Sequence, residues 1–285
     1  MGIKSKIKKY LNKLRKVVKQ PVYIPVLQGD LLKNKTVLIT GGSGGIGSAI
    51  ALSCIQNGAS VIVAGRNKKK LKSTVDQLKS ELKFDTQKVI PFVFDMQNVI
   101  GAKAKLYSLV EEYNIERIDV LVNNAGVSAG SSVGDTSEAD FDKTLDTNLK
   151  GTYFLSQIVS NYMIENHIEG NILNVSSVSG IRPAITPYMV SKWGVIGLTQ
   201  GLAKKLIKHG IVVNGIAPGP ATTEMLGLDG SDLSYDKAPA GRYSAPVEIA
   251  NLAIFLISDM GRMIVGDTVY ITGGCGNLTV DDINY

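Results

Sequence analysis

Residues 36–47 read Thr-Val-Leu-Ile-Thr-Gly-Gly-Ser-Gly-Gly-Ile-Gly, a short apolar run that ends in a glycine-rich turn. The run Thr36–Thr40 is apolar on both faces, as expected of a strand that is covered on both sides of a sheet. A helical pattern, Gly47–Gln56, follows the turn. Glycines at such a turn let the backbone approach a pyrophosphate, and the free N–H groups of the helix N-terminus attract its charge. A strand, glycine turn and helix in this order indicate a dinucleotide site.

The same alternation of apolar runs and amphipathic segments continues along the rest of the chain. The expected strands are Thr36–Thr40, Ser60–Ala64, Val89–Phe94, Ile118–Val122, Asn171–Val175, Ile211–Ile216 and Thr268–Ile271. Helical patterns lie between them, as at Lys70–Leu82 and Trp193–Lys208. This order predicts an α/β fold, a single-domain doubly wound parallel sheet of the Rossmann type with about seven strands, over residues 29–285. Residues 222–244 are irregular, and a loop of that length predicts a lid over a binding site.

The first 28 residues differ in composition from the rest and predict a basic amphipathic extension. Residues 1–20 hold eight of the 31 lysines and arginines and no acid, which leaves 23 basic against 25 acidic residues in the remainder. A basic groove for nucleic acid is therefore not expected. Apolar residues recur there at helical spacing: Ile3, Ile7, Leu11, Leu14 and Val18. Two interpretations stay open: a surface helix that contacts anionic lipid or an acidic partner, and an arm that packs on the body or on another subunit.

Cysteine and histidine are scarce. The two cysteines, Cys54 and Cys275, build no disulfide framework and suit a reducing cytoplasm, which is the expected location; the basic extension would add a peripheral membrane contact. With two histidines and no Cys/His cluster of zinc spacing, no metal site is expected. No signal peptide or membrane-spanning segment is expected either.

The end of the second expected strand reads Ala64-Gly65-Arg66-Asn67. A dinucleotide site that hydrogen-bonds a free ribose 2′-hydroxyl places an acidic residue at this position. Here Gly65 stands at or next to that position with Arg66 beside it, and a guanidinium matches a 2′-phosphate through charge-assisted hydrogen bonds. The sequence thus favours NADP(H), with NAD(H) and a merely solvated basic turn as the alternatives.

Further motifs complete a set. Asn123-Asn124-Ala125-Gly126 follows the fourth expected strand, Tyr188-Met189-Val190-Ser191-Lys192 lies in a helical pattern, Ser177 follows the fifth strand, and Asn148 lies in the helix before that strand. With the glycine turn, these motifs make the chain resemble the short-chain dehydrogenase/reductase family over about residues 33–275, and 3-oxoacyl-carrier-protein reductases are closest in appearance. The resemblance implies an NAD(P)-dependent oxidoreductase that moves a hydride between the nicotinamide and a carbonyl or secondary alcohol carbon.

The spacing of the tyrosine and the lysine suits acid/base chemistry. Tyr188 and Lys192 are four residues apart, so on a helix they share a face. A free tyrosine has a pKa near ~10, and a nearby ammonium together with an oxidised nicotinamide would lower it. The resemblance implies that Tyr188 is the acid/base, that Lys192 also holds the nicotinamide ribose, and that Ser177 hydrogen-bonds the substrate oxygen. It further implies that Asn148 holds a water in a proton relay, while Ser176 competes with Ser177 for the serine role.

The resemblance also implies a set of cofactor-binding residues. They are Gly41, Ser43, Gly45, Ile46, Gly47, Arg66, Asn67, Asp95, Asn124, Ala125, Gly126, Tyr188, Lys192, Pro218, Gly219 and Thr223. Two departures from the family pattern stand out. Ser177 and Tyr188 are eleven residues apart, closer than is usual, so the loop between them is shortened. Gly44 stands where many NADP(H)-dependent relatives carry a basic residue.

The expected partner is a small-molecule or acyl-thioester ketone, and the resemblance implies a homotetramer or homodimer. A sugar-nucleotide epimerase or dehydratase is less favoured, because those relatives usually carry a larger C-terminal substrate domain. From a different class of protein, a non-catalytic sensor or scaffold that binds NADP(H) is the alternative. Such proteins typically lose one of the four catalytic groups, all of which are present in this sequence.

Overall fold

The structure is a computed structural model that describes residues 29–228, 230–276 and 278. The predicted basic extension, residues 1–28, lies outside the described residues, and so does its predicted contact with lipid or an acidic partner. In the part of the chain that is described, no helix combines the length and the apolar character that crossing a bilayer requires.

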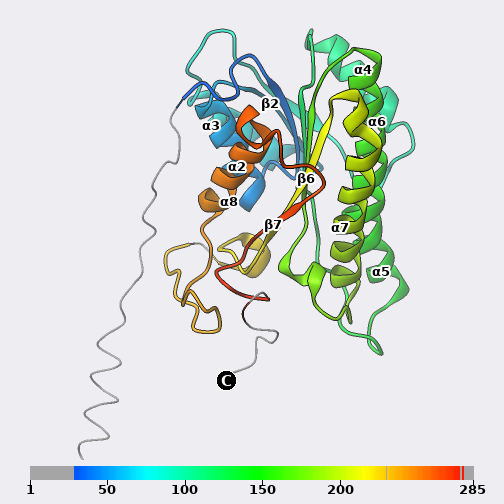
Figure 1. The fold of residues 1–285 in the computed structure, drawn as a ribbon, viewed down its shortest axis with the longest axis vertical. Helices are drawn as coiled ribbons and strands as arrows, with labels where there is room; N and C mark the ends of the chain where they lie inside the picture. The colour runs from blue at the N-terminus through cyan, green and yellow to red at the C-terminus, as the bar shows by residue number, and fades with distance from the viewer. Residues whose placement is uncertain (1–28, 229, 277, 279–285) are drawn as a thin grey trace, which may run out of the picture.

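Seven parallel strands form one sheet, which confirms the predicted fold class (Figure 1). They are β1 (Thr36–Thr40), β2 (Ser60–Gly65), β3 (Val89–Val93), β4 (Val120–Asn123), β5 (Asn171–Val175), β6 (Val212–Pro218) and β7 (Thr268–Ile271). Their order across the sheet is β3-β2-β1-β4-β5-β6-β7. The order of the strands reverses between β1 and β4, and in doubly wound sheets the crevice outside the carboxyl ends of the strands at such a point binds ligands.

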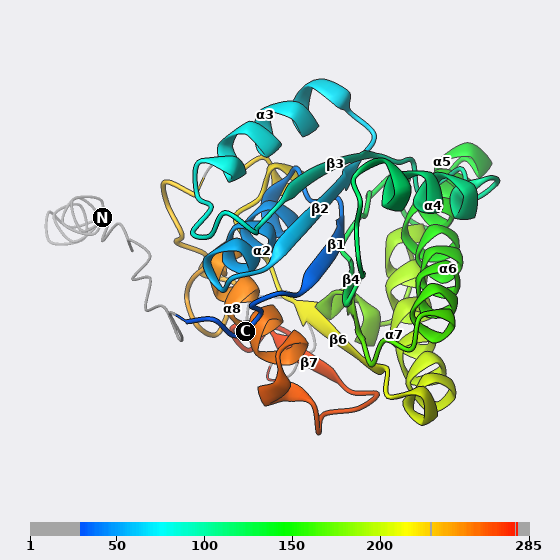
Figure 2. The same cartoon turned by 90° about the horizontal axis from the view of Figure 1, so that it is seen from above.

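Helices cover both faces of the sheet (Figure 2). On one face lie α2 (Gly45–Gln56), α3 (Lys68–Lys79) and α8 (Pro246–Ile257); on the other lie α4 (Ala102–Glu112), α5 (Glu138–Leu145), α6 (Gly151–Glu165) and α7 (Pro187–Leu206). Short elements connect them: a π-helical turn η1 (Asp146–Lys150) and the 3₁₀ turns η2 (Val178–Ile181), η3 (Ile207–His209), η4 (Glu224–Leu226) and η5 (Asp259–Gly261).

Alternation along the strands divides the core into two halves. In β1, Val37 and Ile39 belong to the cluster that contains the buried residues of α2 and α8, whereas Leu38 belongs to the cluster on the opposite face with residues of α4 and α6. All three side chains are fully buried. Burying a side chain of this size contributes roughly 1.5–3 kcal/mol. Because the strands are apolar on both faces, helices cover both faces of the sheet and bury it in the interior. The edge formed by the carboxyl ends of the strands remains accessible to a ligand.

One helix boundary matters for the site. The predicted helix over Trp193–Lys208 begins six residues earlier, at Pro187, so Tyr188 lies in its first turn. The cause is a local cap: the side chain of Thr186 accepts a hydrogen bond from the N–H of Met189 at 3.2 Å. A proline suits the first helical position, because its missing N–H would have no partner there.

Candidate active site

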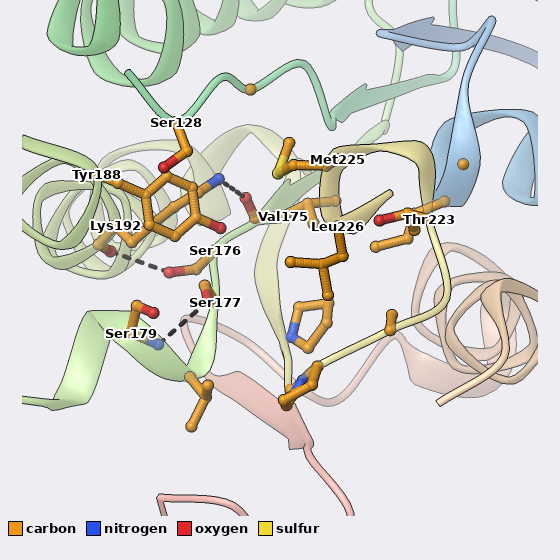
Figure 3. Close-up of a pocket in the computed structure, with 18 of the residues that line it drawn as sticks. Ser128, Val175, Ser176, Ser177, Ser179, Tyr188, Lys192, Thr223, Met225 and Leu226 are labelled. Atoms are coloured by element: carbon orange, nitrogen blue, oxygen red, sulfur yellow. Dashed lines mark hydrogen bonds between the residues drawn. The ribbon is translucent and has the colours of Figure 1, made fainter. Parts of the chain in front are cut away.

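A cavity of about 670 Å³ opens at the carboxyl edge of the sheet (Figure 3). Its lining comes from the glycine turn after β1, the segment after β4, the ends of β5 and β6, the start of α7 and the segment after β6. These segments are far apart in the sequence, and the parallel sheet brings them together because the carboxyl ends of its central strands share one edge.

The glycine turn forms one wall of this cavity through Gly41, Gly44, Gly45 and Ile46. Gly41 and Gly45 have φ angles of +62° and +43°, in the left-handed region that favours glycine. A Cβ at Gly47 would overlap the carbonyl oxygen of Gly41, so the first turn of α2 packs directly on the loop. The turn therefore presents backbone to the cavity at a helix N-terminus, as a pyrophosphate site requires.

Asn124 fastens the glycine turn to the segment after β4. Its amide nitrogen donates to the carbonyl oxygens of Thr40 and Gly41, at 3.0 and 3.2 Å. In return, the hydroxyl of Thr40 accepts the N–H groups of Asn124 and Ala125, each at 3.0 Å. Ala125 and Gly126 follow on the cavity wall. The Asn124 side chain thus binds the protein's own backbone and holds two walls of the cavity in register.

The structure brings most of the predicted cofactor-binding residues to the cavity, but not all of them. The cavity is lined by Gly41, Gly45, Ile46, Asn124, Ala125, Gly126, Tyr188, Lys192, Pro218, Gly219 and Thr223. Ser43, Gly47, Arg66, Asn67 and Asp95 do not line it. The side chain of Asn67 caps α3, and Asp95 accepts the N–H of Gln97 at 3.1 Å. Arg66 is exposed directly after β2.

Ser177, Tyr188 and Lys192 meet inside the cavity (Figure 3). The side chains of Ser177 and Tyr188 both line it, and their interaction favours the phenolate of Tyr188. Ser177 is held by its local fold, because its hydroxyl also accepts the N–H of Ser179 at 3.1 Å as the cap of η2. The ammonium of Lys192 lies 5.5 Å from the centre of the Tyr188 ring. A pair of hydroxyl groups thus faces the cavity with an ammonium behind it.

Burial dominates the electrostatics of Lys192. Its side chain is buried, and its ammonium donates one hydrogen bond, at 2.9 Å, to the carbonyl oxygen of Val175 at the end of β5. Removal from water disfavours the charged form, which lowers the pKa of Lys192 from 10.5 to about 8. Lys192 is therefore a cation at neutral pH that begins to release its proton as the pH rises toward 8.

Protein groups alone do not lower the pKa of Tyr188, and the prediction from the sequence also included the positive charge of an oxidised nicotinamide. Burial raises that pKa, and the interaction with Ser177 opposes the rise without outweighing it. The reason is that desolvation disfavours a buried phenolate. A lowered pKa at Tyr188 would need a further positive charge in the cavity.

The structure separates the two competing serines. The hydroxyl of Ser176 donates to the carbonyl oxygen of Lys192 at 2.9 Å, which ties the end of β5 to α7. Ser177, one residue on, is the serine whose side chain interacts with the phenol of Tyr188 and favours its phenolate. The catalytic assignment of Ser177 stays a prediction, but geometry favours it over Ser176.

Asn148 lies behind the cavity in the π-helical turn η1 and is fully buried. Its amide clamps one residue by both backbone groups, because its oxygen accepts the N–H of Val127 at 2.8 Å and its nitrogen donates to the carbonyl of Val127 at 2.9 Å. The same nitrogen donates to the hydroxyl of Ser191 at 3.0 Å. These hydrogen bonds hold the segment after β4 against the residue that precedes Lys192 in α7. The predicted role of Asn148 in a water relay stays a prediction.

The segment after β6 forms the opposite wall of the cavity, where Figure 3 shows Met225 and Leu226 across from Tyr188. Leu228 and Tyr235 of the predicted lid line the cavity as well. Leu233 does not line the cavity, and its side chain is buried. The segment is closed on itself by bridges between residues 221 and 244 and between residues 234 and 242.

The sequence does not predict several of the lining residues, among them Ser128, Ser179, Arg182 and Tyr243. The ring of Tyr243 stacks on that of Tyr235, with centroids 4.3 Å apart, so two aromatic rings border the cavity. Arg182 lies in the short loop between Ser177 and the tyrosine of α7. The sequence could have indicated that Arg182 lies near the site, because its loop joins Ser177 and Tyr188, which were both assigned to the site.

Comparison with known proteins identifies the family of this chain. The model of the short chain dehydrogenase family matches residues 35–233. The chain belongs to the short-chain dehydrogenase/reductase family. The 3-oxoacyl-[acyl-carrier-protein] reductase of Thermotoga maritima is 38% identical over 248 residues, which cover 85% of this chain and 98% of that relative. This short-chain dehydrogenase/reductase is accordingly an oxidoreductase that acts on CH–OH and C=O groups.

Solved structures of the family agree with the fold of this enzyme. A short-chain dehydrogenase from Burkholderia cenocepacia in complex with NADP has a TM-score of 0.74 at 29% identity, over 85% of this chain and 98% of that one. A 3-oxoacyl-[acyl-carrier protein] reductase from Brucella melitensis with bound NAD has a TM-score of 0.77 at 27% identity, over 90% of this chain and 97% of that one. Together they support a nicotinamide cofactor for this short-chain dehydrogenase/reductase, and they differ in which one they hold.

Proposed function

We propose that this enzyme is an NADP(H)-dependent carbonyl reductase or alcohol dehydrogenase in which Tyr188 transfers the proton. The observation that carries the proposal is that the side chains of Ser177 and Tyr188 meet in the cavity, with Lys192 one helical turn behind Tyr188. Two hydroxyl groups that face the same part of a cavity can both reach a single substrate oxygen. That is the arrangement a carbonyl needs when its oxygen gains negative charge.

The residues around the cavity fit a nicotinamide dinucleotide. The turn from Gly41 to Gly47 offers backbone N–H groups at the N-terminus of α2 for the pyrophosphate. Pro218 and Gly219 offer backbone at the end of β6 for the carboxamide, and a Cβ at Gly219 would lie 2.7 Å from the Cα of Thr272. When bound there, the cofactor supplies or accepts the hydride.

The side chains of this chain handle the proton. In the direction of reduction, Tyr188 donates its proton to the substrate oxygen, and in oxidation it removes the proton from the alcohol. Ser177 donates a hydrogen bond to the same oxygen, where charge develops. The positive charge of Lys192 favours the phenolate of Tyr188 after the proton has left, and its pKa of about 8 lets it exchange a proton near neutral pH.

One cation supports NADP(H) over NAD(H). Arg66 is exposed directly after β2, where an NAD(H) site would place an acid. A 2′-phosphate at the end of β2 would be attracted by the guanidinium of Arg66.

The proposed substrate is a ketone on a small molecule or an acyl thioester. Sequence identity of 38% and 35% with two 3-oxoacyl-[acyl-carrier-protein] reductases supports a 3-oxoacyl thioester as the substrate. The apolar side chains of Met225, Leu226 and Leu228 on the cavity wall suit an acyl chain, and the segment 222–244 would close over it as a lid. The exposed aromatic residues Phe141 of α5 and Tyr153 of α6 support assembly into a homodimer or homotetramer through these helices.

The experiment that tests the proposal is the Tyr188→Phe variant, assayed by the loss of NADPH absorbance with acetoacetyl-coenzyme A and a panel of neutral ketones. We expect turnover to fall by roughly 10²–10⁴-fold, because the acid/base is lost. NADPH binding, followed by nucleotide fluorescence, should stay within a factor of two or so of the wild type, since the phenol is not needed for the pyrophosphate.

The matched control is Tyr107→Phe, which removes a tyrosine hydroxyl that hydrogen-bonds Glu165 and does not line the cavity. It should keep its turnover. Full activity in Tyr188→Phe would refute the mechanism. NADPH binding by the wild type without turnover of any ketone would favour the sensor or scaffold instead.

A further inference from the structure

The chain that follows β7 packs against the outside of the cavity. Residues 272–276, which we call the C-terminal segment, come directly after the end of β7, and none of these five described residues lines the cavity. The side chain of Cys275 is fully buried, and its backbone N–H donates to the carbonyl oxygen of Thr272 at 3.3 Å. The C-terminal segment is therefore a packed part of the domain that contributes no surface to the substrate.

The C-terminal segment contacts two walls of the cavity from behind. At the end of β6, a Cβ at Gly219 would lie 2.7 Å from the Cα of Thr272. At the predicted lid, the N–H of Ala240 donates to the carbonyl oxygen of Gly273 at 2.9 Å. Figure 1 shows this red end of the chain beside the segment after β6. Residues 272 and 273 thus fasten the C-terminal segment to two fixed points of the cavity wall.

Gly276 makes the third contact, with η2. Its φ angle is +77°, in the left-handed region that favours glycine. A Cβ at Gly276 would overlap Cγ2 of Val178, whereas the next nearest atom, Cδ1 of Ile181, would lie at 3.5 Å, an ordinary contact distance. Val178 is buried and is the first residue of η2. The C-terminal segment and η2 can approach this closely only because residue 276 has no side chain.

The placement of η2 determines where the hydroxyl of Ser177 lies. Ser177 caps η2: its hydroxyl accepts the N–H of Ser179 at 3.1 Å, and its carbonyl oxygen accepts the N–H of Gly180 at 2.9 Å. A displacement of Val178 toward the cavity therefore moves Ser177 with it. Misplacing a group that acts on the substrate by ~1 Å can cost about 10²-fold in rate.

We propose that Gly276 is a positioning residue: its missing side chain lets the C-terminal segment hold η2 where the hydroxyl of Ser177 reaches the substrate oxygen. The inference rests on the proposed function for the role of Ser177, and it adds a residue outside the cavity on which that role depends. Gly276 touches neither the substrate nor the cofactor in this arrangement and acts only through η2.

The first test is Gly276→Ala in the ketone assay with NADPH. We expect kcat to fall by about 10–10²-fold, because the added methyl group displaces η2 and Ser177. The dissociation constant for NADPH should stay within about a factor of two of the wild type, because the change does not touch the glycine turn. The control is Gly101→Ala, where φ is +75° and no atom lies within 4 Å of the Cβ position. It introduces the same backbone strain without an overlap and should keep kcat.

A second substitution tests where the methyl group acts. Val178→Ala removes the atom that a Cβ at Gly276 would overlap. In a Val178→Ala protein the same methyl group fills space instead of colliding, so adding Gly276→Ala should raise kcat or leave it unchanged. A fall as large as in the protein that keeps Val178 would overturn the proposal. The comparison also serves if Gly276→Ala alone fails to fold, because neither protein in it contains the overlap.

A double-mutant cycle with Ser177→Ala tests the path of the effect. If Gly276 acts through the hydroxyl of Ser177, then Gly276→Ala should lower kcat by less than about twofold once that hydroxyl is gone. A purely structural effect on the cavity would lower kcat equally with and without the hydroxyl, and that result would overturn the positioning role.

A fluorescence measurement separates failure of this inference from failure of the proposed function. The indole N–H of Trp193, the single tryptophan of the chain, donates at 2.6 Å to the carbonyl oxygen of Arg182, directly after η2. Displacement of η2 moves this acceptor. Gly276→Ala should therefore shift the emission of Trp193, added Val178→Ala should reverse the shift, and Gly101→Ala should cause none.

The two readouts give distinct outcomes. If the wild type turns over no ketone, the proposed function fails, while the shift of Trp193 emission and its reversal still uphold the placement of η2 by Gly276. If the wild type reduces ketones and Gly276→Ala keeps both its kcat and its emission, the positioning role is overturned and the ketone chemistry stands.

Discussion

Replacing Lys192 by methionine should stabilise this protein while abolishing its proposed chemistry. Methionine has a similar length and carries no charge, so the variant removes the buried ammonium and keeps most of the packing. The fall in the pKa of Lys192 from 10.5 to about 8 corresponds to about 3 kcal/mol by which burial disfavours the charged form. Methionine also loses the hydrogen bond to the carbonyl of Val175. This loss costs only about 1 kcal/mol, because the carbonyl borders the cavity and can bind water instead.

The pH dependence identifies the cause. At pH 7 both the folded and the unfolded chain hold the proton, so the full cost of burying the charge is present. As the pH rises past about 8, the folded protein releases the proton before the unfolded chain does, and the cost declines until it vanishes above 10.5. It falls from about 3 kcal/mol at pH 7 to about 1 kcal/mol at pH 9.5. Lys192→Met should therefore be about 2 kcal/mol more stable than the wild type at pH 7 and about equal to it at pH 9.5.

The assay is urea unfolding at both pH values without added nucleotide, compared as a difference between variant and wild type, in which shared groups such as Cys54 cancel. The control is Lys204→Met, an exposed lysine on the same helix, which should change the unfolding free energy by less than about 0.5 kcal/mol at either pH. A Lys192→Met protein that is less stable than the wild type at pH 7, or whose advantage does not shrink with pH, would refute the assignment of the lowered pKa to desolvation.

Two further predictions concern the cofactor. Arg66→Ala should raise KM for NADPH about tenfold and leave KM for NADH nearly unchanged, because the guanidinium is assigned to the 2′-phosphate. Lys79→Ala, at the end of α3, is the control, and equal losses for both nucleotides would contradict the assignment. Gly47→Ala should lower the unfolding free energy by about 1–3 kcal/mol and weaken NADPH binding, because the added methyl group overlaps the glycine turn. In contrast, Gly201→Ala, exposed in α7 with open space around its Cβ position, should be neutral or stabilise by up to about 1 kcal/mol, as urea unfolding would report.

The sequence alone was sufficient for the parts of this protein that depend on neighbours along the chain. The strand, glycine turn and helix of residues 36–56 follow from apolar patterning and from the conformations that only glycine adopts readily. The four-residue spacing of Tyr188 and Lys192 places both on one helix face. Repetition of the same pattern predicted a parallel sheet of about seven strands and the alternation of strands and helices along the chain.

Tertiary structure decided what depends on residues that are distant in the sequence. It brought Arg182 to the cavity, placed the ammonium of Lys70 beside Gly44, and bound Asn148 to Val127. It also buried the phenol of Tyr188, and burial raises the pKa of that group. Helical spacing and turn conformation are set by bonds within a few residues, whereas desolvation and charge proximity sum over atoms from every segment that packs around a group. Only the folded chain defines those surroundings.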